Sequence, residues 1–249
     1  MKYMFLMYGP EDAWNDQERN DCMTESMGIC KELAGKGKFI STSPLQPIAT
    51  AATVRMRDGR PLITDGPFAE TREQLGGYFI LDLADLDEAI GVASRLPPAR
   101  KGTAEIRPMV TVDGLPPSKP VPVGFHGKGP QPYMLVSLDD EEMWEKAGPD
   151  AHREAMAKAI AICHRLNESG KYLGCSPLHP AATATCVRVR NGKREITDGP
   201  FAETNEVVGG FYVIMADSRE EALGVATEHC RINQRAVEVR PLYDLAGLG

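Results

Sequence analysis

Short apolar runs typical of β-strands alternate along the chain with longer stretches of helical periodicity. Residues 3–8 and 133–137 are apolar runs, and each precedes a long segment of mixed polarity. In the second of these segments Met156, Ile160 and Cys163 recur at the spacing of one helix face, with charged residues between them. The pattern predicts a strand and an amphipathic helix at two places in the chain.

Two dipeptides mark tight turns. Asp58-Gly59 and Asn191-Gly192 each separate two short arms that are rich in β-forming residues. Type I′ hairpin turns need positive φ at both central residues, and Asn, Asp and Gly tolerate that conformation best. Both segments are therefore predicted to be two-residue β-hairpins.

Further strands and helices follow each hairpin. Residues 77–83 and 210–216 are apolar and β-rich, and Asp85 and Ser218 come shortly after them, each with a glutamate three residues later. That spacing is a capping box, in which the Asp or Ser caps an amide and the Glu reaches back to the cap residue's own amide. A second helix is predicted after each cap, and a last strand ends the unit.

The chain contains an internal repeat. Residues 43–93 and 176–226 align without gaps at an offset of 133, and 28 of the 51 positions are identical, which chance does not produce. We therefore expect a first repeat at 1–112, a Pro/Gly-rich linker at 113–131 and a second repeat at 132–249. The repeat by itself does not separate functional residues from structural ones.

The predicted order in each repeat is β-α-β-hairpin-β-α-β, an α+β plan. It is a ferredoxin-like unit with a β-hairpin inserted after its second strand. Both helices of such a unit cover one face of its sheet, so the other face needs a cover of its own. The second repeat is the obvious cover, and we predict that the two units pack sheet to sheet as a pseudo-dimer within one chain.

Composition narrows the function. Hydrophobic residues make up 42% and charged residues 25% of the chain, as in ordinary globular proteins, and the formal net charge is −7. This charge disfavours nucleic acid as a partner.

The apolar run near Met1 is too short for a signal peptide or a membrane span, so we expect a cytoplasmic protein and no membrane partner. Neither the six cysteines nor the histidines have metal-ligand spacing, and we predict no metal and no cofactor.

Both repeats carry the string ITDGPFAET, followed by GGYF or GGFY. In these motifs the chain resembles the YCII-related family, and specifically its DGPF-motif branch. The resemblance implies a dimeric α/β-barrel of two ferredoxin-like sheets, here formed by the two repeats within one chain. It also implies an association with extracytoplasmic-function sigma factors for some members, and a His/Asp pair has been proposed as an active site in relatives. The family's usual lysine after the motif is replaced by Arg72 in the first repeat and by Asn205 in the second.

Candidate acid–base residues lie in and near these motifs. Asp65 and Asp198 open the two DGPF segments; each can orient an imidazole or, alternatively, cap the Gly-Pro-Phe turn as an Asx-turn. His179 lies on a Pro-flanked loop where the first repeat has Gln46, and it is either a general acid/base or a surface residue. Because Gln46 does not titrate, we predict two functionally unequal sites.

Candidate ligand-binding residues complete the set. Gln46 is a candidate because it occupies the position of His179 in the first repeat. Glu70 and Glu203 follow the phenylalanines of the two motifs and can line a pocket or cap a turn. The candidate cations are Arg72, Arg55 and Arg188, of which the last two lie on the hairpin arms. Arg55 and Arg188 can bind an anionic ligand. Alternatively, they are solvated strand charges that pair with Glu105 or Glu238.

Three functions remain open from the sequence. One is an enzyme that uses His179 and Asp198 as an acid/base pair in a cleft between the repeats. Another is a non-catalytic small-ligand binder or an accessory protein linked to sigma-factor regulation. The last is a structural partner-binding module. A further homo-oligomer is compatible with each, and whether the protein is an enzyme stays open at this level.

Overall fold

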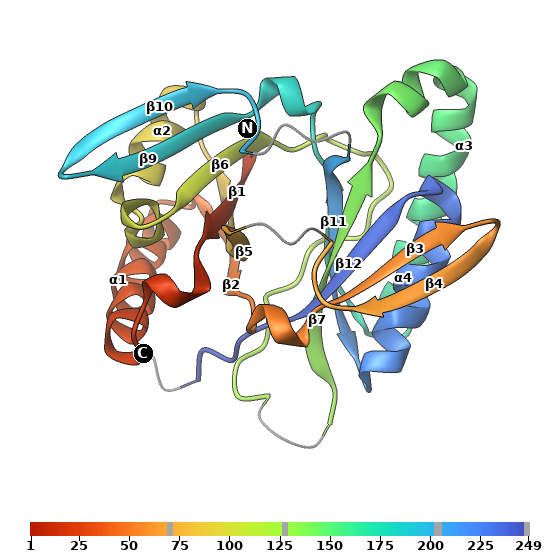
Figure 1. Ribbon diagram of the computed structural model, residues 1–249, viewed down its shortest axis with the longest axis horizontal. Helices are drawn as coiled ribbons and strands as arrows, with labels where there is room; N and C mark the ends of the chain where they lie inside the picture. The colour runs from red at the N-terminus through yellow and green to blue at the C-terminus, as the bar shows by residue number, and fades with distance from the viewer. Residues whose placement is uncertain (69–71, 126–128, 202–205, 247–249) are drawn as a thin grey trace.

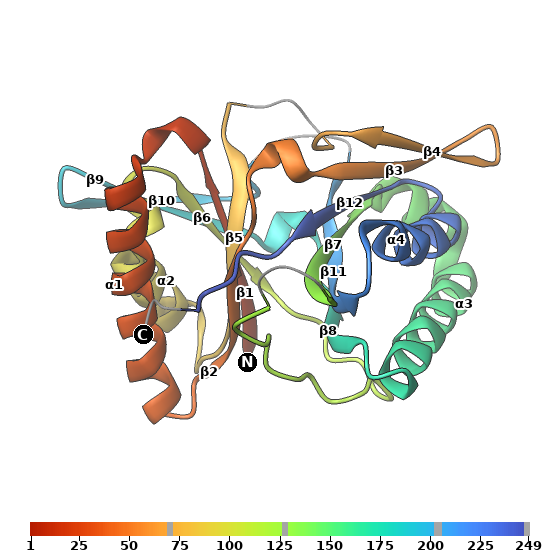
Figure 2. The same ribbon diagram turned by 90° about the horizontal axis from the view of Figure 1, so that it is seen from below.

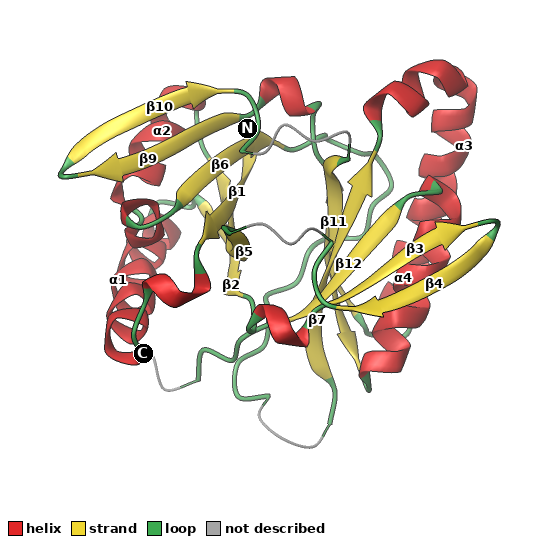
Figure 3. Ribbon diagram, in the orientation of Figure 1, coloured by secondary structure: helices red, strands yellow, loops and turns green. Residues whose placement is uncertain are grey.

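The structure is a computed structural model, and it describes residues 1–68, 72–125, 129–201 and 206–246. Two antiparallel six-stranded sheets face one another in the middle of the molecule (Figure 1). Two helices cover the outer face of each sheet, as the view from below shows (Figure 2). Helices and strands together account for both repeats, with loops mainly at the ends of the sheets (Figure 3). In the described part of the chain, no helix is both long and apolar enough to cross a membrane.

The first repeat follows the predicted order of elements. Its strands and helices are β1 (Lys2–Gly9), α1 (Asp16–Gly35), β2 (Phe39–Pro44), β3 (Ala52–Arg57), β4 (Arg60–Asp65), β5 (Gln74–Asp82), α2 (Leu86–Arg95) and β6 (Thr103–Pro108).

The second repeat has the same order. Its strands and helices are β7 (Gln131–Asp139), α3 (Glu141–Glu168), β8 (Tyr172–Pro177), β9 (Thr185–Arg190), β10 (Lys193–Asp198), β11 (Val207–Ala216), α4 (Arg219–Asn233) and β12 (Ala236–Pro241).

The two repeats exchange their hairpins. The first sheet has the order β10-β9-β6-β1-β5-β2, and the second has β4-β3-β12-β7-β11-β8. The four strands β6-β1-β5-β2 form the ferredoxin-like sheet of the first repeat, but the hairpin beside them, β9–β10, comes from the second. In the register of this junction, Ala104 of β6 pairs with Val187 of β9. Sequence patterns predict the position of each hairpin but not the exchange.

The turn prediction is confirmed, and the cap prediction needs one correction. Asp58 and Asn191 have φ of 51° and 52°, and the glycine after each has φ of 73°, as a type I′ turn requires. Asp85 does accept the amide of Glu88 at 2.9 Å. The Glu88 carboxylate, however, accepts the amide of Ala84, one residue before the expected one, at 2.8 Å.

Helix α3 differs from its counterpart α1 in having an extra first segment. The N-terminal ends of the repeats align at an offset of 130 and the later parts at 133, so the second repeat has three additional residues near 148–150, which the sequence places before a helix. In the structure a helix already begins at Glu141 and is broken at Gly148, whose φ of 83° is followed by Pro149. Proline lacks the amide hydrogen that would continue the helical bonding, so the two segments meet at a kink.

Three apolar cores hold the layers together. An outer core lies between each sheet and its helices, and each contains residues of the exchanged hairpin: Val187 in the first, Ala52 and Val54 in the second. The inner core lies between the sheets and draws on both repeats; its central members are Met4, Leu6, Tyr78, Ile80, Met134, Val136, Phe211 and Val213. The two repeats therefore share one buried interior.

Bridges and the linker close the ends of the space between the sheets. Leu45, just after β2, pairs with Leu242 after β12, and Met109 after β6 pairs with Leu178 after β8. The linker runs along β8, where Lys119 donates its amide to the carbonyl of Leu173 at 2.7 Å. Apolar linker side chains pack against both the inner core and the outer core of the second sheet.

Candidate functional site

Each DGPF turn is held by a buried glutamate of the other repeat. The amide of Phe68 donates to the carboxylate of Glu238 at 2.9 Å, and the amide of Phe201 donates to that of Glu105 at 2.8 Å. Both glutamates lie on the last strand of their repeat and are almost inaccessible to solvent. A charge-assisted hydrogen bond of this kind fixes the turn to the last strand of the other repeat.

A buried arginine neutralises each of these glutamates. Arg107 donates to Glu105 at 3.2 Å and Arg240 to Glu238 at 3.1 Å, and both arginines are 1% exposed. Each guanidinium also donates across the repeat boundary: Arg107 to the carbonyl of His179, and Arg240 to that of Gln46. We call these two Glu–Arg pairs, with the phenylalanine amides and the carbonyls that they bind, the cross-repeat latches.

His179 and Gln46 therefore take part in the latches through their backbone. The Gln46 side chain donates to the carbonyl of Leu242 at 3.1 Å. Asp198 is exposed, and Asp65 is exposed and forms an ion pair with Arg219 of α4. Over the residues that the structure covers, no hydrogen bond joins the ring of His179, which is partly buried, to Asp198. The proposed His179–Asp198 pair stays a prediction.

The candidate cations have separate surroundings. Arg55 forms an ion pair with Glu206 at 3.1 Å and lies over the ring of Phe68, 4.4 Å from its centroid, so its partner is neither Glu105 nor Glu238. Arg188 donates to the hydroxyl of Thr103 at 2.7 Å. Arg72 is exposed. Two further candidates, Glu70 and Glu203, lie outside the described residues.

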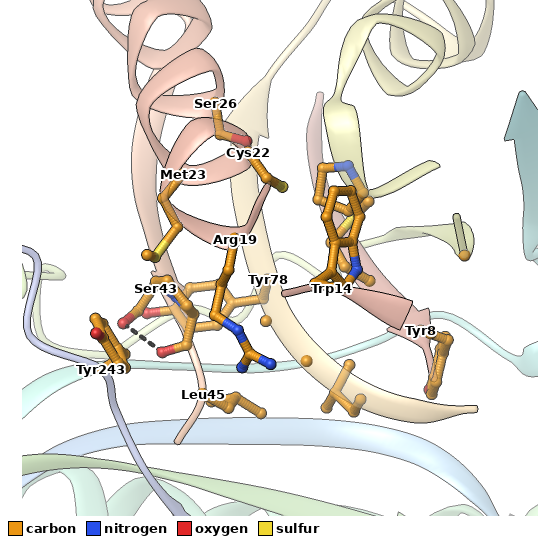
Figure 4. Close-up of a pocket in the computed structure, with 18 of the residues that line it drawn as sticks. Tyr8, Trp14, Arg19, Cys22, Met23, Ser26, Ser43, Leu45, Tyr78 and Tyr243 are labelled. Carbon is orange, nitrogen blue, oxygen red and sulfur yellow. Dashed lines mark hydrogen bonds between the residues drawn. The ribbon is translucent and has the colours of Figure 1, made fainter. Parts of the chain in front are cut away.

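A cavity of about 170 Å³ lies in the first repeat between α1 and the ends of β1, β2 and β5 (Figure 4). Its walls are mainly apolar and include Met7, Trp14, Met23 and Leu75. The second repeat also contributes, because Arg240, Tyr243 and Leu245 after β12 close one side of it. We call this cavity the repeat-1 pocket.

One cation points into the repeat-1 pocket. Arg19 extends from the first turns of α1, and its guanidinium lies among the other lining side chains (Figure 4). It donates to the carbonyl of Glu11 at 3.2 Å. Within the described ranges no carboxylate is in ion-pair distance of it. The thiol of Cys22 adds no charge, because burial raises its pKa to about 11.

Charged residues of the second repeat occupy the corresponding region there. The pocket-lining residues Gly9, Pro10 and Gly102 align with Asp139, Asp140 and Arg235. Asp140 and Arg235 form an ion pair at 2.5 Å. The first repeat thus has no side chain, or only a proline ring, where the second has three charged ones. A Cβ at Gly9 would meet nothing closer than 3.6 Å, whereas a Cβ at Gly102 would clash with the carbonyl oxygen of Tyr8.

A buried polar network positions Asp139. Its carboxylate accepts the hydroxyl of Ser137 at 3.2 Å and the amide of Asn233 at 3.1 Å. The Ser137 hydroxyl is 2.9 Å from Nε2 of His229, whose Nδ1 is 2.8 Å from the hydroxyl of Tyr212. These bonds form one chain from the helix-side core to the carboxylate. The aligned residues of the first repeat have no polar side chain at four of these positions: Met7, Gly9, Phe79 and Leu96.

The surroundings of Asp139 change the pKa of its carboxyl. Burial raises the pKa of its carboxyl, and the bonds from Asn233 and Ser137 and the nearby charge of His152 act in the opposite direction. His152 lies edge-on to Trp144, with the ring centroids 5.5 Å apart. A buried carboxyl whose pKa is raised in this way is a candidate for acid–base chemistry.

These features were missed by sequence reasoning, which concentrated on residues shared by the repeats. His229, His152 and Asp139 have no counterpart of the same type in the first repeat. The signal that marks them is the difference between the copies: Gly9 against Asp139, Arg19 against His152, and Leu96 against His229.

Fold and cavity together define a class: a two-repeat α+β protein whose sheets share one core and whose first repeat contains a pocket of small-molecule size. The YCII-related domain family matches residues 1–113 and again residues 132–246. The chain therefore belongs to the YCII-related family, with two copies of its domain.

Individual proteins are also similar to this chain. An uncharacterized protein of Rhizobium meliloti (strain 1021) is 37% identical over 114 residues, which cover 44% of this chain and 92% of that protein. That relative is thus about as long as one repeat. Among solved structures, a putative chlorite dismutase has a TM-score of 0.46 at 10% identity, covering 99% of this chain and 96% of its own. A mutant of the chlorite dismutase from Candidatus Nitrospira defluvii has a TM-score of 0.40 at 11% identity, covering 99% and 92%.

The buried histidine generates a prediction about pH. Burial lowers the pKa of His229 to about 4, against an ordinary value of about 6.5. As pH falls through this interval the unfolded chain binds a proton that the native state excludes, so the free energy of unfolding decreases. For this group the loss between pH 7 and pH 4 is about 3 kcal/mol.

The measurement compares wild type with His229→Leu, which installs the residue type found at Leu96, by urea unfolding at pH 7 and pH 4.5. At pH 7 the variant should be less stable by about 1–3 kcal/mol, because the buried hydroxyl of Tyr212 loses its hydrogen-bond partner and that of Ser137 loses one of its partners. Its stability should decrease less between the two pH values than that of wild type. Equal decreases in the two proteins would show that His229 does not titrate in this way.

Proposed function

We propose that this protein binds a small molecule in the repeat-1 pocket. The observation that carries the proposal is the cavity of about 170 Å³, with apolar walls from the first repeat and one side formed by residues 240, 243 and 245 of the second. Small-molecule sites are typically concave, mostly apolar and equipped with a few polar groups that orient the ligand. The pocket has that composition, and Arg19 is one of its polar groups.

The location of the pocket supports a role for both repeats. The chain after β12 reaches it because Tyr243 donates its amide to the carbonyl of Pro44 at 2.9 Å. Arg240, which belongs to a cross-repeat latch, also lines it. Ligand binding is therefore expected to depend on the arrangement of the two repeats as a face-to-face α/β-barrel, the arrangement that the resemblance to YCII-related proteins implies.

The proposal is tested by filling the cavity. Ser26 lies on α1, is 7% exposed and lines the pocket, so Ser26→Leu should occupy part of it. Benzyl alcohol is a suitable neutral probe. At ten times its Kd it should stabilise wild type by about 1.4 kcal/mol, seen as a higher melting temperature, because it binds only the native state.

In Ser26→Leu this stabilisation should be lost. The matched control is Ala159→Leu, which introduces the same side chain at the aligned position of α3, away from the cavity. The control should respond to benzyl alcohol as wild type does. Equal responses in all three proteins would refute binding in the repeat-1 pocket.

Acid–base chemistry is the second candidate function, and Asp139 favours it. The desolvated carboxyl, held by Ser137 and Asn233 and influenced by His152, is a candidate general acid or base of the second repeat. The pair His179 and Asp198, with Asp65, remains the pair predicted from the sequence. In this proposal the second repeat performs the proton transfer and the first binds a ligand.

The titration of Asp139 tests this candidate. A ¹³C NMR titration of the carboxyl groups, assigned with Asp139→Asn, should give a midpoint above the ordinary value of about 3.9. Gly209→Ala should disturb it, since a Cβ there would clash with the carboxylate of Asp139; Gly76→Ala is the matched control, because its Cβ would meet nothing closer than 3.7 Å. A midpoint at or below the ordinary value would remove Asp139 from consideration.

The resemblance to the DGPF-motif branch supplies further proposals. It suggests an accessory role in sigma-factor regulation and, with the composition, a cytoplasmic location. The first rests on the two DGPFAET strings, and the second on the composition. A further homo-oligomer is compatible with them.

A further inference from the structure

The repeat-1 pocket has a size that restricts its occupant. An apolar cavity of about 150 Å³ engineered into a protein core binds benzene. At about 170 Å³ the repeat-1 pocket has room for one six-membered ring with a small substituent. A nucleotide is larger than this space.

The lining favours an aromatic ring over an aliphatic one. Three methionines and a neutral cysteine line the pocket: Met7, Met23, Met27 and Cys22. Thioether sulfur makes favourable contacts with aromatic rings, and methionine side chains adapt to a planar guest. Trp14 and Tyr78 add aromatic surface to the same walls.

Arg19 is the cation of the pocket that can receive an anion. It has five N–H donors, one of which is used by the carbonyl of Glu11 at 3.2 Å. Glu11 also lines the pocket. Its carboxylate accepts the amide of Ile48 at 2.5 Å, and it forms no ion pair with Arg19 within the described residues. The other lining guanidinium, Arg240, is already neutralised by Glu238. Arg19 therefore remains as a planar cation that matches a carboxylate.

We infer that the repeat-1 pocket takes a single-ring aromatic carboxylate, with the ring against Trp14 and the methionines and the carboxylate on Arg19. This inference rests on the proposed binding function and specifies the class of its ligand. The second repeat does not share the site, because Asp139 stands where the first repeat has Gly9 and His152 stands where it has Arg19. A carboxylate at that position would repel an anionic ligand.

The experiment compares benzoate with benzyl alcohol, which has the same ring without the charge. The chain has two tryptophans, so Trp144→Phe leaves Trp14, in the pocket wall, as the one reporter of binding. In this background, fluorescence titration should show that benzoate binds about ten- to hundredfold more tightly than benzyl alcohol, the ratio expected for hydrogen bonds to a charged group.

Two kinds of variant separate charge from volume. Arg19→Met should reduce benzoate affinity to that of benzyl alcohol, because the hydrogen bonds to the cation are lost. The affinity for benzyl alcohol should stay within about twofold of the starting value, because the apolar walls remain. Gly9→Asp and Gly9→Asn add side chains of equal size. Only the aspartate adds a negative charge to the pocket lining, so benzoate should bind Gly9→Asn more tightly than Gly9→Asp. Benzyl alcohol should not distinguish the two.

The outcomes are distinguishable. If benzyl alcohol binds and Ser26→Leu abolishes it, but benzoate gains nothing from Arg19, the pocket remains and the carboxylate class is refuted. If neither probe changes the fluorescence of Trp14, both the ligand class and the proposed binding function fail. Tighter benzoate binding that needs Arg19 and is weakened specifically by Gly9→Asp supports the inference.

Discussion

The structure depends on one interaction made twice: a buried glutamate on the last strand of each repeat binds the phenylalanine amide of the other repeat's DGPF turn. Glu105 holds Phe201 and Glu238 holds Phe68, and a buried arginine neutralises each carboxylate. A charge buried in this way is tolerated only when it is paired and hydrogen-bonded. Each DGPF turn follows the exchanged hairpin, at the point where the chain returns to the sheet of its own repeat. Holding these turns in place therefore fixes the two sheets against each other.

The same frame produces two unequal ends. Where the first repeat has Gly9, no side chain enters this region, and Gly9 lines the repeat-1 pocket. Where the second has Asp139 and Arg235, charged side chains and a buried polar network occupy the corresponding region. One copy thus contains a cavity and the other contains titratable groups, while the latches are common to both.

Most of the fold follows from local sequence signals, and most of the site does not. Asp58-Gly59 and Asn191-Gly192 determine their turns through positive φ, which nearby sequence alone specifies. The sheet that a hairpin joins depends on contacts more than a hundred residues away, such as Cys230 of α4 beside Val54, and local patterns do not contain them. Residues identical in both repeats turned out to form the latches, whereas positions where the copies differ mark the pocket.

The central claim is that the latches and exchanged hairpins make the two repeats one cooperative unit. Each repeat contains one tryptophan, Trp14 or Trp144, so the variants Trp144→Phe and Trp14→Phe report on the repeats separately. Urea unfolding followed by fluorescence should give the same fraction unfolded at each urea concentration as circular dichroism of the same variant, which follows both repeats at once. A circular dichroism curve with two transitions, of which each tryptophan reports a different one, would contradict the account.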